Sequence, residues 1–171
     1  MVDFCICVQP GTNSPHHEAI RTLCLDRPGL SINHTDWGDL TKYPIAISIE
    51  TKGPEQSYDT ALLQVATWHS AQWRSLCWGR HDPIDAIEFL PGIIVIKHDW
   101  YFVATDLDRF GKARTFERIP LGSTESILGI YKLSMALLTL CRWVRDQYWP
   151  AFQADILGLE VEVDGGETGA E

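Results

Sequence analysis

The sequence shows few signs of a secreted or membrane-bound protein. An acid stands at Asp3 and no basic stretch precedes an apolar run, so we expect no secretory leader. The five cysteines are odd in number, which favours free thiols over a disulfide framework. Residues 127–144 resemble a membrane span in hydropathy, but Lys132 and Arg142 interrupt them, so we expect a buried core helix there. We therefore expect an intracellular protein, cytoplasmic or nuclear, that contacts no membrane.

Motifs for several common chemistries are also missing. The sequence contains no Gly-x-Ser-x-Gly elbow, no phosphate-cradling glycine loop and no internal repeat. Cys5 and Cys7 alternate onto one face of a predicted strand, and His16 and His17 follow. A structural zinc site needs four ligands, usually as two spaced pairs, and no second pair is visible. Serine hydrolases of the elbow type, P-loop enzymes and zinc modules are thus disfavoured.

The composition is that of one soluble globular domain. Of the 171 residues, 45% are hydrophobic and 22% are charged, which is close to the average and allows a substantial core. The net charge is −9, whereas a protein that depends on nonspecific phosphate contacts is usually basic. Six of the 23 acids and none of the 14 bases lie in residues 155–171. We predict a domain over residues 1–154 and an acidic, disordered tail over residues 155–171.

Hydrophobic periodicity and turn residues indicate alternating strands and helices. Predicted extended segments are residues 2–8, 30–35, 43–52, 93–97, 100–105 and, weakly, 110–121. Predicted helices are residues 17–25, residues 59–78 with Asp59 as the N-cap, and a long helix that Ser123 or Thr124 caps and Pro150 ends near Tyr148. We expect residues 93–97 and 100–105 to form a hairpin about His98 and Asp99.

Residues 43–52 are the clearest strand. Isoleucines occupy every second position from Ile45 to Ile49, and the positions between them are small or apolar until Glu50. Nearly continuous apolar character predicts a central strand that is covered on both faces.

The end of this strand presents the chemically most informative pair. Glu50 and Lys52 are two residues apart, so their side chains point to the same face. A carboxylate can hold Mg²⁺ through oxygen, the cation can activate a water, and the lysine can orient that water or stabilise developing charge. One carboxylate makes a poor Mg²⁺ site, so we expect Asp3, an isolated acid in an apolar strand, to be the second, with Asp36 in reserve.

An alternative without catalysis stays open for each of these residues. Glu50 and Lys52 could form an ordinary ion pair at a solvated strand end. Gln64 and Trp68 share one face of the following helix, so Gln64 could reach the metal or the water. Equally, Gln64 could be a surface residue and Trp68 a core aromatic.

Five stretches resemble the fungal PD-(D/E)XK nuclease-like domain, a branch of the restriction-endonuclease-like superfamily. They are Val2-Asp3-Phe4 and residues 30–36 (LSINHTD), 44–52 (PIAISIETK), 90–105 (LPGIIVIKHDWYFVAT) and 122–131 (GSTESILGIY). The resemblance implies an α/β core with a central mixed sheet flanked by helices. It assigns Asp3 and Glu50 to the metal and Lys52 to the water, and Gln64 with Trp68 resembles the Gln-x-x-x-aromatic element of the exonuclease branch. The implied chemistry is Mg²⁺-dependent hydrolysis of DNA or RNA.

The sequence departs from the family pattern at its start. In such domains a helix and a strand usually precede the strand that bears the first aspartate, whereas here Met1 lies two residues before Asp3. Either the start codon is placed late, or the protein lacks the N-terminal helix and first strand, which would expose a sheet edge. The long separation between Asp3 and Glu50 predicts an insertion.

Two functions remain open at this point. One is an active nuclease, for which Arg109, Lys112, Arg114 and Arg118, interleaved with phenylalanines, offer a strip for backbone contacts and stacking. A solvated connecting loop explains the same strip. The other function is a nuclease fold without hydrolytic activity, serving as an interaction or accessory factor, for instance beside a fungal secondary-metabolite pathway.

Overall fold

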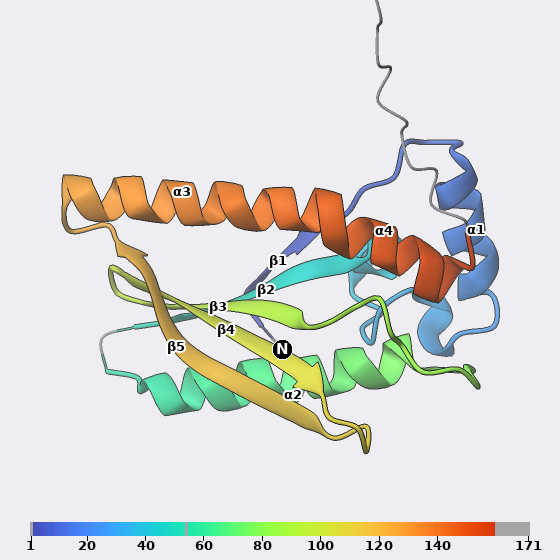
Figure 1. The fold of residues 1–171 in the computed structure, drawn as a ribbon, viewed down its shortest axis with the longest axis horizontal. Helices are drawn as coiled ribbons and strands as arrows, with labels where there is room; N and C mark the ends of the chain where they lie inside the picture. Colours follow the sequence, from blue (N-terminus) through green and yellow to red (C-terminus); the bar gives the residue numbers. More distant parts are fainter. Residues whose placement is uncertain (1, 54, 160–171) are drawn as a thin grey trace, which may run out of the picture.

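A mixed five-stranded sheet forms the centre of the computed structural model, which describes residues 2–53 and 55–159. The strands follow one another across the sheet in chain order (Figure 1). They are β1 (Phe4–Cys7), β2 (Ile45–Lys52), β3 (Leu90–Ile96), β4 (Asp99–Leu107) and β5 (Ala113–Ser123). β2 and β3 are parallel, and the other neighbouring strands are antiparallel.

Helices lie on both sides of this sheet (Figure 1). α2 covers one face, while α3 and the helical turns that follow it lie over the other. Together with the mixed sheet, this arrangement confirms the predicted α/β fold class. The helices are α1 (Pro15–Cys24), α2 (Tyr58–Leu76), α3 (Ile127–Trp143) and α4 (Trp149–Phe152); π-helical turns span Val144–Tyr148 and Gln153–Leu157, and 3₁₀ turns span Pro28–Leu30 and Gly38–Thr41.

β2 is the central strand that its sequence predicts. Ile45 and Ile47 are fully buried, and β2 pairs with β1 on one side and with β3 on the other. In the parallel ladder, Ser48 lies beside Gly92. A Cβ atom on Gly92 would come within 2.8 Å of Val65 and 3.1 Å of His69, both in α2. The face that bears Ser48 therefore lies directly against α2, and glycine at position 92 allows this close approach.

Aromatic side chains of the C-terminal helical segment cover the opposite face of the sheet. Tyr148 and Phe152 are fully buried and share one hydrophobic cluster with Ile47 and Ile93. The Tyr148 hydroxyl also donates a 2.7 Å hydrogen bond to the carbonyl oxygen of Ile45, so it anchors the segment to the start of β2. This hydrogen bond satisfies a polar group that would otherwise be buried without a partner.

Several local predictions are confirmed and others are wrong. The hairpin of β3 and β4 is present, with Lys97 and His98 between the paired residues Ile96 and Asp99. Ser57 rather than Asp59 caps α2, since its hydroxyl accepts the Thr60 N–H. Residues 30–35 form no strand, because the asparagine of that loop, Asn33, binds backbone groups of neighbouring segments. The segment predicted to be weakly extended, residues 110–121, largely coincides with the long strand β5 (Ala113–Ser123), which pairs with β4.

The predicted cap and end of the C-terminal helix are also wrong. Ser126, rather than Ser123 or Thr124, caps α3 through the Gly129 N–H. Pro150 does not end the helical segment, because it stands in the first turn of α4, directly after a π-helical turn. A proline is tolerated in a first turn, where its missing N–H leaves no bond broken, and π turns accommodate local misfit. The segment ends at Gly158, whose positive φ of 63° suits glycine.

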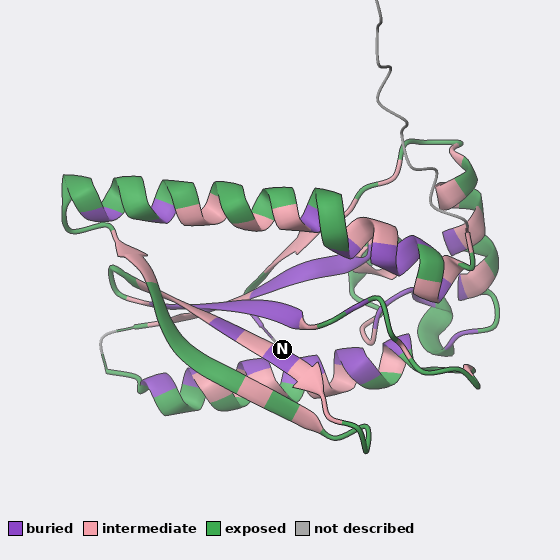
Figure 2. Cartoon of the chain, viewed as in Figure 1, coloured by how far each residue is buried: buried purple, intermediate pink, exposed green. Residues whose placement is uncertain are grey.

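α3 is not the buried core helix that its apolar sequence predicts. Along Ile127–Leu157 the most apolar 18-residue window has a mean hydropathy of 1.4, enough by length and composition to cross a membrane, yet only 6% of that window is buried. Figure 2 shows exposed residues along most of α3 and buried ones in the turns beyond it. Within the predicted core helix, residues 127–144, only Gly129, Leu133 and Val144 are buried, whereas Tyr148 and Phe152, which enter the core, lie beyond it. The exposed large apolar residues of α3 are Ile127, Leu128, Ile130, Tyr131, Met135 and Leu138.

The predicted boundary at residue 154 falls inside ordered structure. The helical turn Gln153–Leu157 crosses it, and Ile156 is buried in the core. One carboxylate oxygen of Asp155 accepts hydrogen bonds from the backbone N–H groups of Ala86 and Ile87. The remainder of the predicted acidic tail, residues 160–171, lies outside the described residues.

The contrast between the two sides of α3 gives a stability prediction. Tyr131 is 69% exposed, so Tyr131→Gln should change the free energy of unfolding by less than about 0.5 kcal/mol. Leu133 is 7% exposed, so Leu133→Ala should lower that free energy by about 2–5 kcal/mol. Urea unfolding of both variants beside the wild type measures the difference. A large loss in Tyr131→Gln would show that the outer side of α3 is covered in solution.

Candidate functional site

Glu50 and Lys52 form a buried ion pair at the end of β2. The Lys52 Nζ atom lies 2.6 Å from Oε1 of Glu50, and the side chains are only 9% and 1% exposed, respectively. The strand geometry places both side chains on the face against α2, as predicted. The pair is thus not the solvated strand-end ion pair considered above, because water is nearly excluded from it.

Two oxygen atoms in this layer have no partner in the described part of the chain. Oε2 of Glu50 and Oγ of Ser48 are both buried without a hydrogen bond. Both belong to residues on one face of β2, two positions apart. Leaving a buried polar atom unpaired costs about 1–3 kcal/mol, so such atoms call for an explanation. Oxygen donors are the ligands that Mg²⁺ prefers.

The donor chemistry at this position fits a hard divalent cation. Mg²⁺ is commonly bound by one or two carboxylates, several waters and a substrate phosphate. Glu50 supplies one carboxylate oxygen, and the Ser48 hydroxyl can add a second oxygen. Within residues 2–53 and 55–159, no group of three or more His, Cys, Asp or Glu side chains is arranged to hold a metal ion. A cation bound here would therefore depend on water or substrate for most of its ligands.

Asp3, the predicted second metal ligand, is bound to Thr51. Its Oδ2 atom accepts hydrogen bonds from the Thr51 N–H at 2.8 Å and from the Thr51 hydroxyl at 2.7 Å. Thr51 points to the opposite face of β2 from Glu50, and no hydrogen bond or ion pair joins the Asp3 carboxylate to Glu50 or Lys52 in the described structure. Partial burial raises the pKa of Asp3, but the hydrogen bonds from Thr51 and the charge of Lys52 outweigh it, and the net pKa is lowered. Asp3 is thus ionised at neutral pH.

Gln64, Trp68 and Asp36 make no hydrogen bond or ion pair with Glu50 or Lys52 in the described structure. Gln64 is half-buried on α2 and lines a shallow pocket together with Trp68. Trp68 is buried among Ile45, Val65 and other core residues, as expected if Trp68 is a core aromatic. Asp36 lines a different pocket. Among the described contacts, none joins these three residues to Glu50 or Lys52.

The basic strip of residues 109–118 lies on β5 and in the turn before it. Several of its arginines already contact acidic or aromatic side chains of the protein. Both oxygens of Asp106 bind the Arg114 guanidinium, and Arg109 lies 4.7 Å from the ring of Phe110. Arg118 lies 4.5 Å from the ring of Tyr58, and its N–H donates to the Tyr58 hydroxyl. Because Tyr58 begins α2, the strip reaches the part of the fold that follows β2 directly in the chain.

Two histidines that the sequence analysis did not select are largely withdrawn from water: His69, on the side of α2 that faces the sheet, and His34, which is half-buried in the loop of residues 27–36. His69 is fully buried, and its Nδ1 atom lies 2.9 Å from the Thr105 hydroxyl, while Nε2 has no partner in the described structure. The ring of His34 lies edge-on to Trp68 at 4.1 Å. Burial lowers the pKa of His69 to about 3 and that of His34 to about 4. The buried stripe Ala61, Val65, Trp68, Gln72 on α2 was the available signal for His69, which follows Trp68 on the same face.

Because the pKa values of His34 and His69 are lowered in the folded protein, we expect the protein to lose stability in acid. Their folded-state pKa values lie below the ordinary value of 6.5, so the stability they support is complete above that value and falls as the pH drops toward 4. Between pH 7 and pH 4.5, His69 alone should cost the wild type about 2–3 kcal/mol. Urea unfolding of wild type and His69→Gln at both pH values measures this: the variant should lose correspondingly less stability, and equal losses would contradict the prediction.

Comparison with known proteins identifies the family. The family model described as the PD-(D/E)XK nuclease superfamily matches residues 1–149, from before β1 to the start of α4. The match includes Glu50 and Lys52 and extends over most of the chain. No curated protein and no solved structure matches the chain. Because the family model extends over well more than half of the sequence, the chain belongs to the PD-(D/E)XK nuclease superfamily.

Proposed function

We propose that this protein hydrolyses phosphodiester bonds of nucleic acid with the help of Mg²⁺, and that Glu50 and Lys52 are its central catalytic pair. The observation that carries the proposal is the buried ion pair whose carboxylate keeps one oxygen without a partner. Replacement of such a pair by apolar residues is often neutral or stabilising, so stability alone does not explain it. Membership of a nuclease superfamily supports the same conclusion.

Each residue of the pair has a separate task in this proposal. The free Oε2 atom of Glu50 and the Ser48 hydroxyl would hold the cation, which when bound activates a water and neutralises phosphate charge. The Lys52 ammonium has three protons, of which Glu50 accepts one. The others are available to hold the attacking water or a phosphate oxygen that gains negative charge.

Asp3 and Gln64 have supporting tasks in the same proposal. The Asp3 N–H donates to the Ile49 carbonyl oxygen, which places position 3 across from position 50. Rotation of the Asp3 side chain away from Thr51 would turn its carboxylate toward the cation as a second ligand. Gln64 would contact water or substrate from α2, the helix that covers the face bearing Glu50.

The proposed substrate is DNA or RNA inside the cell. Arg118 and Arg109, which make no ion pair in the described structure, are the candidates on β5 and its preceding turn for contacts with the phosphate backbone. We place the protein in the cytoplasm or nucleus as part of this proposal, in keeping with free thiols at all five cysteines.

A second candidate function is an interaction or accessory factor that has kept the nuclease fold without the activity. This second function is favoured by the low accessibility of the site to solvent and ligands. The Glu50 side chain is 1% exposed, and the Asp3 carboxylate accepts hydrogen bonds from Thr51. In this case the ion pair would be a remnant that holds the end of β2. The two candidates differ in whether the pair binds a divalent cation.

Cleavage assays test the first candidate. With Mg²⁺ present, Lys52→Met and Glu50→Gln should each lower the rate of cleavage of single- or double-stranded nucleic acid by about a hundredfold or more, because charge stabilisation at the phosphate is lost. Lys42→Met, an equal change at an exposed lysine, should leave the rate unchanged. Lys52→Met also leaves Glu50 buried without its partner and could unfold the protein, so Glu50→Gln, which keeps the shape of the pair, is the decisive variant. Equal rates in wild type and folded Glu50→Gln would contradict the assignment.

Metal titration separates the two candidates without any substrate. Calorimetry of the wild type with Mg²⁺ or Mn²⁺ should show binding that Glu50→Gln abolishes, since the free carboxylate oxygen becomes part of a neutral amide. Glu55→Gln, at an exposed acid after β2, should bind like the wild type. Absence of binding in the wild type, or binding unchanged in Glu50→Gln, would favour the accessory factor.

A further inference from the structure

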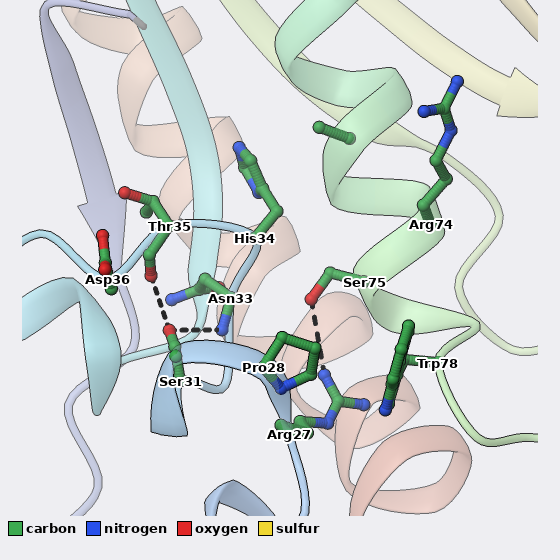
Figure 3. Close-up of a pocket in the computed structure, with 12 residues that line it drawn as sticks. Arg27, Pro28, Ser31, Asn33, His34, Thr35, Asp36, Arg74, Ser75 and Trp78 are labelled. Atoms are coloured by element: carbon green, nitrogen blue, oxygen red, sulfur yellow. Dashed lines mark hydrogen bonds between the residues drawn. The ribbon is translucent and has the colours of Figure 1, made fainter.

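A pocket whose lining includes neither Glu50 nor Lys52 lies between the loop of residues 27–36 and α2 (Figure 3). Its volume is about 380 Å³, within the usual range of about 300–1,000 Å³ for small-molecule sites. The loop of residues 27–36 forms one wall, and the C-terminal half of α2 forms the other. No task in the proposed nuclease mechanism uses this pocket.

Arg27 brings a buried positive charge to the pocket. The residue is 6% exposed, and its guanidinium makes no ion pair in the described structure. Its Nη1 atom donates to the Ile32 carbonyl oxygen at 3.2 Å and to the Ser75 hydroxyl at 3.5 Å. Nε is buried without a partner in the described part of the chain. A buried charge without a counter-charge is costly, so an anion would stabilise this arrangement.

The unused side of the Arg27 guanidinium is the side that binds anions elsewhere in this protein. Arg114 and Arg145 each use Nε and Nη2 together to hold both oxygens of an aspartate. In Arg27 the contacts with protein are made through Nη1. The Nε and Nη2 side therefore has no protein partner among the described residues, and a group with two or more oxygens in a carboxylate- or phosphate-like arrangement would satisfy it once the exposed Trp78 side chain moves aside.

The other polar side chains of the pocket fix its shape. The Asn33 amide donates to the carbonyl oxygens of Leu40 and Tyr43, and its oxygen accepts the Ile45 N–H. The Ser31 hydroxyl donates to the Thr35 carbonyl oxygen. Because these groups are already satisfied, the arginines and His34, whose two ring nitrogens have no partner in the described structure, are the groups left to bind a ligand.

A second arginine and an aromatic ring complete the pocket. Arg74 lines it from α2, is exposed, and makes no ion pair in the described structure. Trp78 is 55% exposed and stands close to Arg27 in Figure 3. The carboxylate that also lines the pocket, Asp36, is drawn away from the Arg27 guanidinium. In Figure 3 the Arg74 side chain also points away from Arg27, so Arg27 is the guanidinium that stands beside the indole ring. A guanidinium fork beside an exposed indole suits a phosphate joined to a nucleobase.

We propose that this pocket binds the phosphate of a nucleotide unit, with Arg27 on the phosphate, Trp78 stacked on the base, and Arg74 reaching the phosphate by rotation of its exposed side chain. The unit can come from a free nucleotide or from a nucleic-acid strand, which share this chemistry. The net charge of −9 repels anions at long range, so binding depends on the local arginines. The inference is independent of the nuclease proposal, because it uses neither Glu50 nor a metal.

Titration in the presence of a chelator tests this pocket separately from the metal site. Inorganic phosphate, a nucleoside monophosphate and a short single-stranded oligonucleotide are added to the full chain, and binding is followed by calorimetry and by a rise in melting temperature. Arg74→Gln should weaken binding of all three about tenfold or more, whereas Arg21→Gln, an exposed arginine in α1, should not. Trp78→Leu should weaken the nucleotide and the oligonucleotide but not inorganic phosphate.

The results of these titrations distinguish a free nucleotide from a nucleic-acid strand, and they can overturn the proposal. Tighter binding of the monophosphate identifies a free nucleotide, and tighter binding of the oligonucleotide identifies a strand. Arg27→Lys keeps the charge but loses the planar fork, so it should weaken binding, and the matched Arg74→Gln result stands if Arg27→Lys does not fold. Failure of the wild type to bind any of the three, or equal binding by wild type and Arg74→Gln, overturns it.

Discussion

The burial of Glu50 and Lys52 is the constraint on which the rest of this structure depends. Taking both ions out of water costs several kcal/mol each, and their mutual attraction returns that cost only with good geometry and further hydrogen bonds. Here the geometry is good, at 2.6 Å, but one carboxylate oxygen has no partner in the described structure. A pair kept under these conditions is understandable as a chemical group that the surrounding strands and helix support. The fold and the proposed chemistry thus meet at the end of β2.

The position of α2 decides how that pair meets solvent and substrate. Gly92, beside Ser48, lets the helix approach until a Cβ atom would touch Val65. This contact excludes water from the layer, where electrostatic interactions are correspondingly stronger. Exposure rises from Glu50 to Lys52, so solvent reaches the pair from the end of the strand. There Tyr58, the first residue of α2, is held by the ring of Tyr101 and by Arg118. Substrate would therefore approach across contacts that β4 and β5 make with the start of α2.

The sequence predicted the parts of this structure that depend on short-range patterns. Alternating isoleucines identified β2 and placed Glu50 and Lys52 on one face, and two apolar runs around a short turn identified the hairpin. The sequence-based prediction failed where the outcome depends on an unusual local backbone geometry or on a contact with a distant part of the chain. Pro150 ends a helix by its own geometry, but a preceding π turn removes the conflict. Apolar residues predict burial of α3, but whether a helix face meets a core depends on what the rest of the chain places beside it. The partner of Asp3 is Thr51, and no spacing rule predicts that choice.

The choice of Asp3 between two partners connects the fold to the two candidate functions. Its carboxylate is ionised and receives two hydrogen bonds from Thr51, which an exposed carboxylate can exchange for water at a net cost of about 1 kcal/mol each. A divalent cation beside Glu50 would attract that carboxylate more strongly than a hydroxyl and an amide do. Binding of the cation and rotation of Asp3 would then favour each other, since the rotated carboxylate gives the cation a second ligand and the cation gives the carboxylate a positive charge to bind. Under the proposed mechanism, the difference between an active nuclease and an inactive relative would therefore lie in the affinity of the Glu50 oxygen for a cation, because the backbone that positions both carboxylates is the same in either case.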